Sequence, residues 1–166
     1  MILFMKYASD TGALLSLACS RHFADVIAEY SIISHRLVIQ ELCNFAIFDD
    51  FLGIKAKLVL QQKLSLEEPG SFLNLPIEET ERAVFSLAHE KKIIALTDDI
   101  HAARIATEKV PKLIIKPSFY LLLHFSQKKK ISKKNITEDL QEIAKSRNWM
   151  QGAIWKYLEK KLQEIN

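Results

Sequence analysis

The stretch from Lys91 to Lys109 constrains the fold of this chain more than any other feature of its sequence. The short apolar run Ile93–Leu96 is followed at once by Thr97, Asp98 and Asp99, and apolar residues then recur at helical spacing. This pattern predicts a buried strand, a carboxylate at its carboxyl end and a helix that begins there. In open α/β sheets, ligands bind at that end of the strands, so the acid is placed for chemistry or for a cation. The simpler interpretation is that Asp98 or Asp99 only caps the helix.

The same order of elements occurs near the N-terminus. Ile2–Ser9 is apolar enough for a central parallel strand, Asp10 ends it, and Ala13–Ala18 opens a helix. Further strands are expected at Ile32–Ser34 and Leu113–Ile115, and helical patterns separate the four strands. This alternation predicts an α/β fold with three α/β/α layers and a central parallel sheet of four or five strands.

The chain length indicates one domain with a C-terminal addition. With 166 residues it can bury a substantial core. Residues 1–117 hold the alternating strands and helices, including a short fifth strand expected at Phe72–Leu75. Residues 118–166 are expected to form a C-terminal helical extension packed on the same domain. Its helices are predicted at Ser118–Ser126, Thr137–Arg147 and Met150–Ile165, with the basic loop Gln127–Lys134 after the first of them.

Composition narrows the class of protein without indicating an activity. Hydrophobic residues make up 49% and charged residues 26%, as in ordinary globular domains, and a net charge of +3 does not by itself mark a nucleic-acid binder. Cys19 and Cys43 lack metal-ligand spacing, so we expect the reduced thiols of a cytoplasmic protein. No apolar run reaches membrane-spanning length, and the start of the chain lacks the features of a signal peptide. We therefore expect no membrane association.

Two further acids are candidates to join the carboxylates at the strand ends. Glu41 lies in an apolar helical run, and Glu81 lies early in a later helix. Glu41 could simply face solvent, and Glu81, like Glu78 and Glu79, suits the positive end of a helix dipole. If the acids converge, their mutual repulsion favours a divalent cation. An all-oxygen ligand set then selects Mg²⁺ or Mn²⁺.

Four short motifs that contain these acids follow one another along the chain. They are SDTGALLSLA with Asp10 and Thr11, VIQEL with Glu41, EETERAVFSLA with Glu81, and IIALTDD with Thr97 and Asp99. In order, spacing and strand context they resemble the motifs of the PIN-domain (PilT N-terminus-like) nucleases of prokaryotes. The resemblance covers about Ile2 to Ile115 and implies the PIN-like form of the α/β/α fold.

The resemblance implies a metal-dependent endoribonuclease that hydrolyses RNA phosphodiester bonds. The catalytic and metal-binding residues would be Asp10, Glu41, Glu81 and Asp99, with one or two Mg²⁺ or Mn²⁺ ions. Thr11 and Thr97 could hydrogen-bond to the ligand carboxylates. Whether Asp98 or Asp99 is the ligand is left open by the sequence, although the Thr-x-Asp spacing favours Asp99.

The resemblance also implies partners. RNA would be the substrate, an antitoxin protein would bind if the enzyme is the toxin of a toxin–antitoxin pair, and the domain would form a homodimer. The apolar segments Phe48–Leu60 and Phe119–Phe125 are the candidates for the dimer interface. Residues that could contact an RNA backbone are Arg21, His35, Arg36, Arg104 and the cluster Lys128–Lys134, although a lysine run is also typical of a solvated loop.

The alternative function is a non-catalytic PIN-like domain that acts as an interaction or scaffold protein. Two departures from the family pattern support this alternative. The third acid is Glu81, where the family often has Asp, and Pro111–Ser118 has no acid, where many members carry another. All four acid positions are filled, however, and that favours the enzyme.

Overall fold

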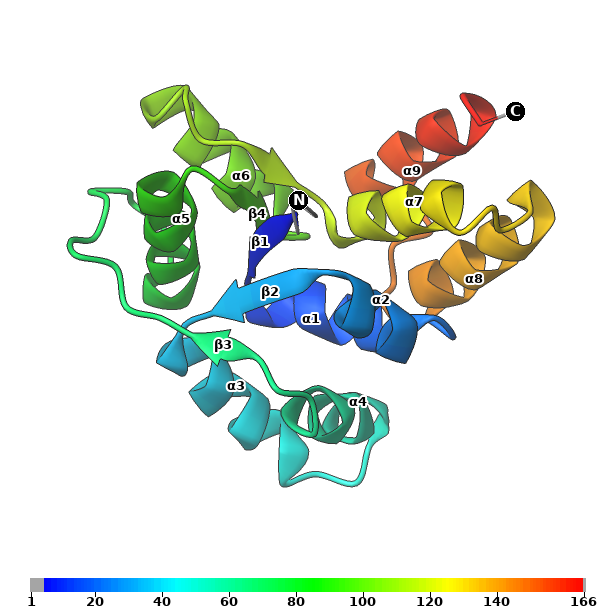
Figure 1. The fold of residues 1–166 in the computed structure, drawn as a ribbon, viewed down its shortest axis with the longest axis horizontal. Helices are drawn as coiled ribbons and strands as arrows, with labels where there is room; N and C mark the ends of the chain where they lie inside the picture. The colour runs from blue at the N-terminus through cyan, green and yellow to red at the C-terminus, as the bar shows by residue number, and fades with distance from the viewer. Residues whose placement is uncertain (1–4, 166) are drawn as a thin grey trace.

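A five-stranded parallel sheet forms the centre of the molecule in the computed structural model, which describes residues 5–165 (Figure 1). Every pair of neighbouring strands is parallel, and the spatial order is β3-β2-β1-β4-β5. This confirms the expected α/β class and the parallel sheet. The first residues of the strand expected at Ile2–Ser9 lie outside the described part of the chain. The strands are β1 (Lys6–Ser9), β2 (Ser31–Ser34), β3 (Ser65–Leu66), β4 (Ile94–Leu96) and β5 (Ile115–Lys116).

Helices cover both sides of this sheet, as a three-layer architecture requires. Figure 1 shows α1, α3 and α4 on one side of the strands and α5 and α6 on the other. Helix α1 packs against α3 and α4, whereas α5 packs against β1 and β4. The helices of this part are α1 (Thr11–Ala18), α2 (Phe23–Glu29), α3 (Arg36–Ala46), α4 (Phe51–Leu60), α5 (Glu79–Lys91) and α6 (Ile100–Lys109).

The C-terminal helices share the hydrophobic core of the sheet domain. They are α7 (Ser118–Lys128), α8 (Lys133–Ser146) and α9 (Ala153–Gln163). Helix α7 packs against α1, α2 and α8. A buried carboxylate also ties α8 to the end of α1: Asp139 accepts hydrogen bonds from Ser20 Oγ at 2.5 Å and from the Arg21 amide at 3.0 Å. Because that carboxylate is only 2% exposed, its hydrogen bonds have little competition from water.

Several predicted strand and helix bounds differ from the structure. The fifth strand is Ser65–Leu66 rather than Phe72–Leu75, because β3 gains its position from pairing with β2 and not from an apolar run. Strand β5 is Ile115–Lys116 rather than Leu113–Ile115, and helix α9 is Ala153–Gln163 rather than Met150–Ile165. Helix α8 begins at Lys133 rather than Thr137, because the side chain of Ser132 accepts a hydrogen bond from the Asn135 amide and caps the helix there.

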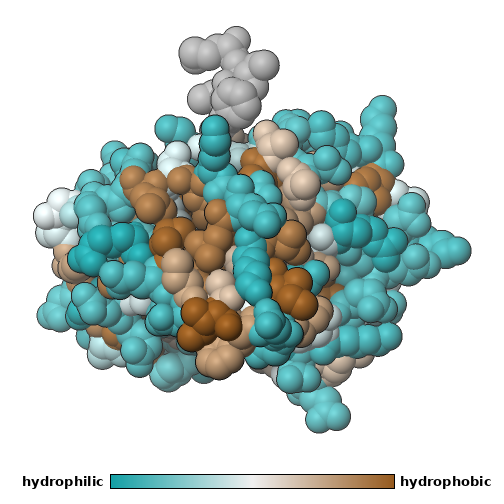
Figure 2. Space-filling model, turned by 90° about the horizontal axis from the view of Figure 1, so that it is seen from below, coloured by the Kyte–Doolittle hydropathy of each residue, from teal (hydrophilic) through white to brown (hydrophobic). Residues whose placement is uncertain are grey.

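The two apolar segments proposed for a dimer interface differ in exposure. Segment Phe119–Phe125 is not available as a dimer interface, because Phe119, Leu121, Leu122 and Phe125 are all buried in the core. The end of α3 and the start of α4 do expose large apolar side chains, and Figure 2 shows hydrophobic residues gathered on this side of the molecule. We call this group the hairpin patch; its members are Phe45, Ile47, Phe48, Phe51 and Ile54.

Among the described helices, none combines the length and the apolar character that are needed to cross a membrane.

Candidate functional site

The strand order creates a break in connectivity between β1 and β4. These strands are neighbours in the sheet, but β1 leads into α1 on one side and β4 leads into α6 on the other. In open α/β sheets, ligands bind at such a break, outside the carboxyl ends of the strands. Asp10 and Asp99 are the N-cap residues of the two diverging helices. The topology therefore brings both predicted acids to one edge.

Asp10 is held in place by both of its carboxylate oxygens. One oxygen accepts a hydrogen bond from the Ala13 amide at 2.8 Å and caps α1, and the other accepts from Thr97 Oγ1 at 2.5 Å. The side chain is 5% exposed. Its pKa is raised from 3.8 to about 7, chiefly because burial removes water from the charged form, and also because Asp98 and Asp99 carry like charges.

Asp99 has a similar local geometry at the end of β4. Its side chain accepts a hydrogen bond from the Ala102 amide at 2.9 Å and so caps α6. Its own amide donates to Thr97 Oγ1 at 3.1 Å. The hydroxyl of Thr97 therefore connects the two acids, accepting from Asp99 and donating to Asp10. Asp10 and Asp99 can cap their helices and also take part in a site, because each cap uses only one of the two carboxylate oxygens.

Glu81 joins this pair from the first turn of α5. Its pKa is raised from 4.5 to about 8, first by burial, then by a hydrogen-bonding contact with Asp99, and further by the charges of Asp99, Asp10 and Glu78. Of the three acids at the start of α5, Glu81 is half-buried, whereas Glu78 and Glu79 are exposed. Glu81 is therefore the member of this group that belongs with Asp10 and Asp99.

Glu41 is linked to the same edge through two threonines. Thr11 Oγ1 donates to one of its oxygens at 2.5 Å and Thr80 Oγ1 donates to the other at 2.6 Å. Thr11 follows Asp10 directly and Thr80 precedes Glu81, so both hydroxyls come from chain segments that carry the other acids. The hydrogen bonds expected of Thr11 and Thr97 are present. Thr80 was not predicted, because a threonine in the first turn of a helix is ordinary.

Asp98 lies on the opposite side of the strand end. It accepts hydrogen bonds from the Ser118 amide and from Ser118 Oγ, both at 2.8 Å. Burial raises its pKa, while hydrogen bonds from Ser118 and Ser16 and the charge of Arg147 lower it. Asp98 thus joins the end of β4 to the start of α7, and Asp99 is the acid that faces the other carboxylates.

The donor set suits a hard divalent cation in chemistry and in charge. It consists of carboxylate oxygens, which Mg²⁺ and Mn²⁺ prefer, and the raised pKa values of Asp10 and Glu81 show that the cluster resists full ionisation. Within residues 5–165, no three His, Cys, Asp or Glu side chains already stand close enough together to hold a metal ion. The carboxylates therefore suit a divalent cation in their chemistry and charge, but the described residues do not form a ready set of three ligands.

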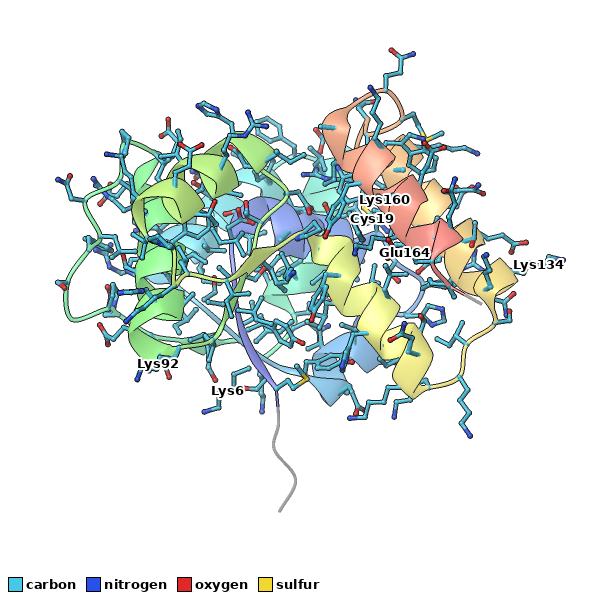
Figure 3. The ribbon with its side chains drawn as sticks, turned by 90° about the horizontal axis from the view of Figure 1, so that it is seen from above. Lys6, Cys19, Lys92, Lys134, Lys160 and Glu164 are labelled. Atoms are coloured by element: carbon cyan, nitrogen blue, oxygen red, sulfur yellow. The ribbon has the colours of Figure 1, made fainter. Side chains whose placement is uncertain are left out.

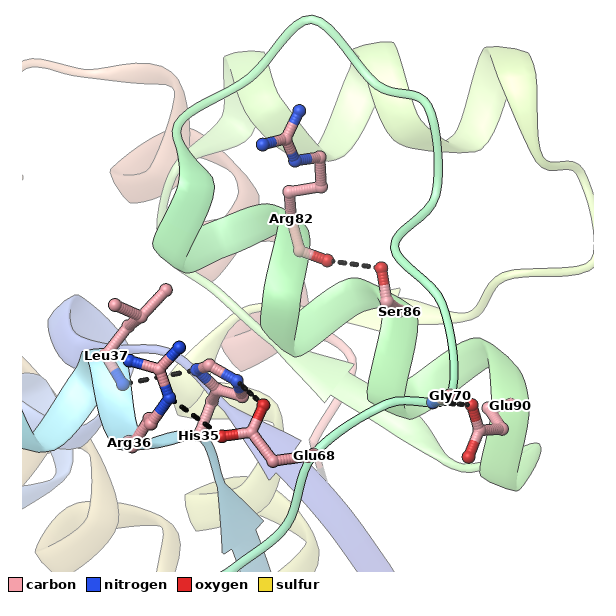
Figure 4. Close-up of polar contacts among 8 residues, drawn as sticks. All are labelled: His35, Arg36, Leu37, Glu68, Gly70, Arg82, Ser86 and Glu90. Atoms are coloured by element: carbon pink, nitrogen blue, oxygen red, sulfur yellow. Dashed lines mark hydrogen bonds and ion pairs between the residues drawn. The ribbon is translucent and has the colours of Figure 1, made fainter.

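Several basic residues that could contact RNA are engaged within the chain. His35 Nδ1 accepts from the Leu37 amide at 3.2 Å, so Nε2 carries the proton that is donated to Glu68 at 2.5 Å (Figure 4). Arg36 contacts the other oxygen of Glu68 at 3.0 Å. Arg21 lies 3.6 Å from Asp139, and Lys128 and Lys129 both contact Glu29. These contacts hold loops and helix ends together and leave the acid edge without cations from these residues.

Comparison of the chain with protein families, with curated proteins and with solved structures found no match.

Proposed function

We propose that this protein is a metal-dependent endoribonuclease of the PIN-like type. The observation that carries the proposal is the meeting of Asp10, Glu81 and Asp99, from three different elements, at the break between β1 and β4. Neighbouring acids with strongly raised pKa values, such as Asp10 and Glu81, are typical of functional sites, because such repulsion has no benefit for stability alone. Glu41 lies within the same network through Thr11 and Thr80.

The chain's own residues would prepare this edge for a phosphodiester. When bound, Mg²⁺ or Mn²⁺ supplies Lewis acidity and a water nucleophile at neutral pH. Asp10 and Asp99 follow strands directly and are fixed by capping hydrogen bonds, so they would hold the ion in a constant position. Thr97 orients Asp10, and the two threonines around Glu41 orient that carboxylate. Glu81, which carries a proton at neutral pH without metal, would complete the ligand set or orient the water.

The test is whether the purified protein cleaves a single-stranded RNA at neutral pH. We expect internal cleavage in Mn²⁺ or Mg²⁺ and none in excess EDTA, with activity restored when metal is added back. Cleavage that persists in EDTA would indicate a different chemistry or a contaminating ribonuclease. No cleavage in either metal, with folded protein, would leave the interaction function as the better proposal.

The hairpin patch favours a protein partner as a second candidate function. It places five large apolar side chains on one exposed surface, and exposed apolar patches of this kind mark interaction sites. A second copy of this chain would cover it in a homodimer, and an antitoxin would cover it in a toxin–antitoxin pair. We expect light scattering at micromolar concentration to give the mass of two chains, and Phe51→Glu to give the mass of one. A single-chain mass for the wild type would exclude the homodimer.

A further inference from the structure

We propose that the C-terminal helices provide a groove for single-stranded RNA that leads to the acid edge, in which Tyr157 stacks on a base and Lys116 and Lys161 contact phosphates. This inference rests on the proposed function for its direction, because it names the path of the substrate. Its evidence is separate, since it depends on a surface that includes none of the four acids.

The groove begins beside the acids. A hollow of about 290 Å³ lies between α6, the end of β5 and α9, and its walls are mostly apolar. Thr97, whose hydroxyl bonds to Asp10, and Ile100, which follows Asp99, line it at one end. Lys116 and Tyr157 line it as well. A chain lying in this hollow would therefore reach the end of β4, where the carboxylates meet.

The same surface continues between α7 and α9. A second hollow of about 320 Å³ shares Lys116 and Tyr157 with the first, and it adds Tyr120 from α7 and Lys161 from α9. Figure 3 shows these two helices side by side, with Lys160 and Glu164 on α9. Because the two hollows share Lys116 and Tyr157, they adjoin, and together they extend from Thr97 at the end of β4 to Ile165 near the end of the chain.

Aromatic rings and ammonium groups are already paired along this path. Lys116 Nζ lies 5.4 Å from the centre of the Tyr120 ring, and Lys161 Nζ lies 5.5 Å from the centre of the Tyr157 ring. Tyr157 is 38% exposed, so its ring is accessible. Lys161 Nζ also lies 3.4 Å from Glu164 Oε2 at the same hollow. A base that stacked on Tyr157 would displace the ammonium group of Lys161 from the ring, and the adjoining phosphate would compete with Glu164 for it.

This combination fits a single strand better than a duplex or a peptide. Stacking on an aromatic ring requires an unpaired base, and lysines that follow the strand contact phosphates without reading sequence. An apolar peptide would use the apolar walls but would not need the lysines. The contribution of the ring, the contribution of charge and the identity of the ligand can therefore be measured separately.

The first measurement is binding of a fluorescein-labelled oligouridylate of about ten nucleotides, followed by anisotropy in EDTA at several salt concentrations. We expect Tyr157→Leu, which keeps apolar bulk but removes the ring, to weaken binding roughly tenfold without changing the salt dependence. Lys116→Gln should weaken binding and lower the slope of log Kd against log salt by about 0.7, the value for one phosphate contact on a single strand. The matched controls are Phe72→Leu and Lys63→Gln, which line neither hollow of the groove and should bind as the wild type does.

The second measurement locates the contact. An oligonucleotide that carries 4-thiouridine should cross-link to the peptide that contains Tyr157 on irradiation, and a cross-link confined to other parts of the chain would overturn the inference. Equal binding by Tyr157→Leu and the wild type would also overturn it.

Parallel cleavage assays of the wild type separate this inference from the proposed function. If the wild type cleaves RNA but the groove variants bind normally, the groove is wrong and the nuclease stands. If the wild type binds RNA through Tyr157 but cleaves nothing in Mn²⁺, the groove stands and the nuclease is wrong. If neither binding nor cleavage is seen, both proposals fail.

Discussion

Asp10→Asn is expected to lower Mn²⁺-dependent cleavage of single-stranded RNA by roughly a thousandfold, because the loss of a charged metal ligand removes several kcal/mol of transition-state stabilisation. The fold should remain intact. Asparagine caps helices as well as aspartate does, and its oxygen can still accept from the Ala13 amide. Its amide group can donate to Thr97 Oγ1 in place of the present bond. The measurement is kcat/KM on one RNA, with circular dichroism to show that the variant is folded.

Asp98→Asn is the matched control for this experiment. Asp98 lies one residue from Asp99 and is half-buried, but it bonds to Ser118 on the other side of the strand end. Its replacement should lower thermal stability, since it weakens the join between β4 and α7, and should leave the activity of the folded protein close to that of the wild type. Full activity of Asp10→Asn, or equal losses in the two variants, would contradict the assignment of the site.

The free energy of unfolding in EDTA is expected to fall as pH rises from about 4 to 8. The pKa of Asp10 is 3.8 in its ordinary state and about 7 in the fold, so between these values the folded protein keeps a proton that the unfolded chain has lost. Since the folded state binds more protons, stability decreases with pH, and the contribution of Asp10 to this loss is about 4 kcal/mol. Glu81 acts in the same direction up to about pH 8.

Two comparisons isolate this effect from other titrating groups. Asp10→Asn should be more stable than the wild type at pH 8 and should show a shallower pH dependence in urea denaturation. Mn²⁺ should stabilise the wild type more at pH 8 than at pH 5, because protons compete with the metal for the same carboxylates. A metal concentration of a hundred times the Kd would raise the free energy of unfolding by about 2.7 kcal/mol. A wild type whose stability is flat across this range, or metal stabilisation that does not depend on pH, would show that the acids do not repel one another in the fold.

The sequence was most informative where local pattern and final environment agree. The apolar runs before Asp10 and Asp99 predicted β1 and β4, because central strands of a parallel sheet are buried on both faces and need such runs. Strand β3 was not predicted because both of its residues are exposed and it gains its place by pairing with β2 at the edge of the described sheet. The start of α8 was not predicted, because a run of lysines is typical of a solvated loop. Lysine is nevertheless a good helix former, and Ser132 supplies the cap.

The sequence predicted which acids lie at this edge of the sheet, but not the hydrogen bonds that link them. The acids at strand ends were identified from position alone. Their neighbours depend on tertiary geometry, and nothing local to Thr80 indicates that its hydroxyl bonds to Glu41 across 39 residues of chain. The orientation of Asp98 away from Asp99 follows from strand alternation, and the structure adds the partner, Ser118. The groove beside α9 involves side chains from four elements and has no signature in the sequence.

The placement of β4 beside β1 has a consequence for how the protein is made. Asp10 and Thr97 are 87 residues apart, so the contact between them cannot form until β4 has emerged from the ribosome. Until then one edge of β1 has no strand partner, and an open edge of a central apolar strand is prone to pair with other chains. A nascent chain that stops before β4 therefore lacks the acid cluster, and the unpaired edge of its β1 strand can pair with other chains. Synthesis through α6 supplies the missing strand and assembles the carboxylates in the same event.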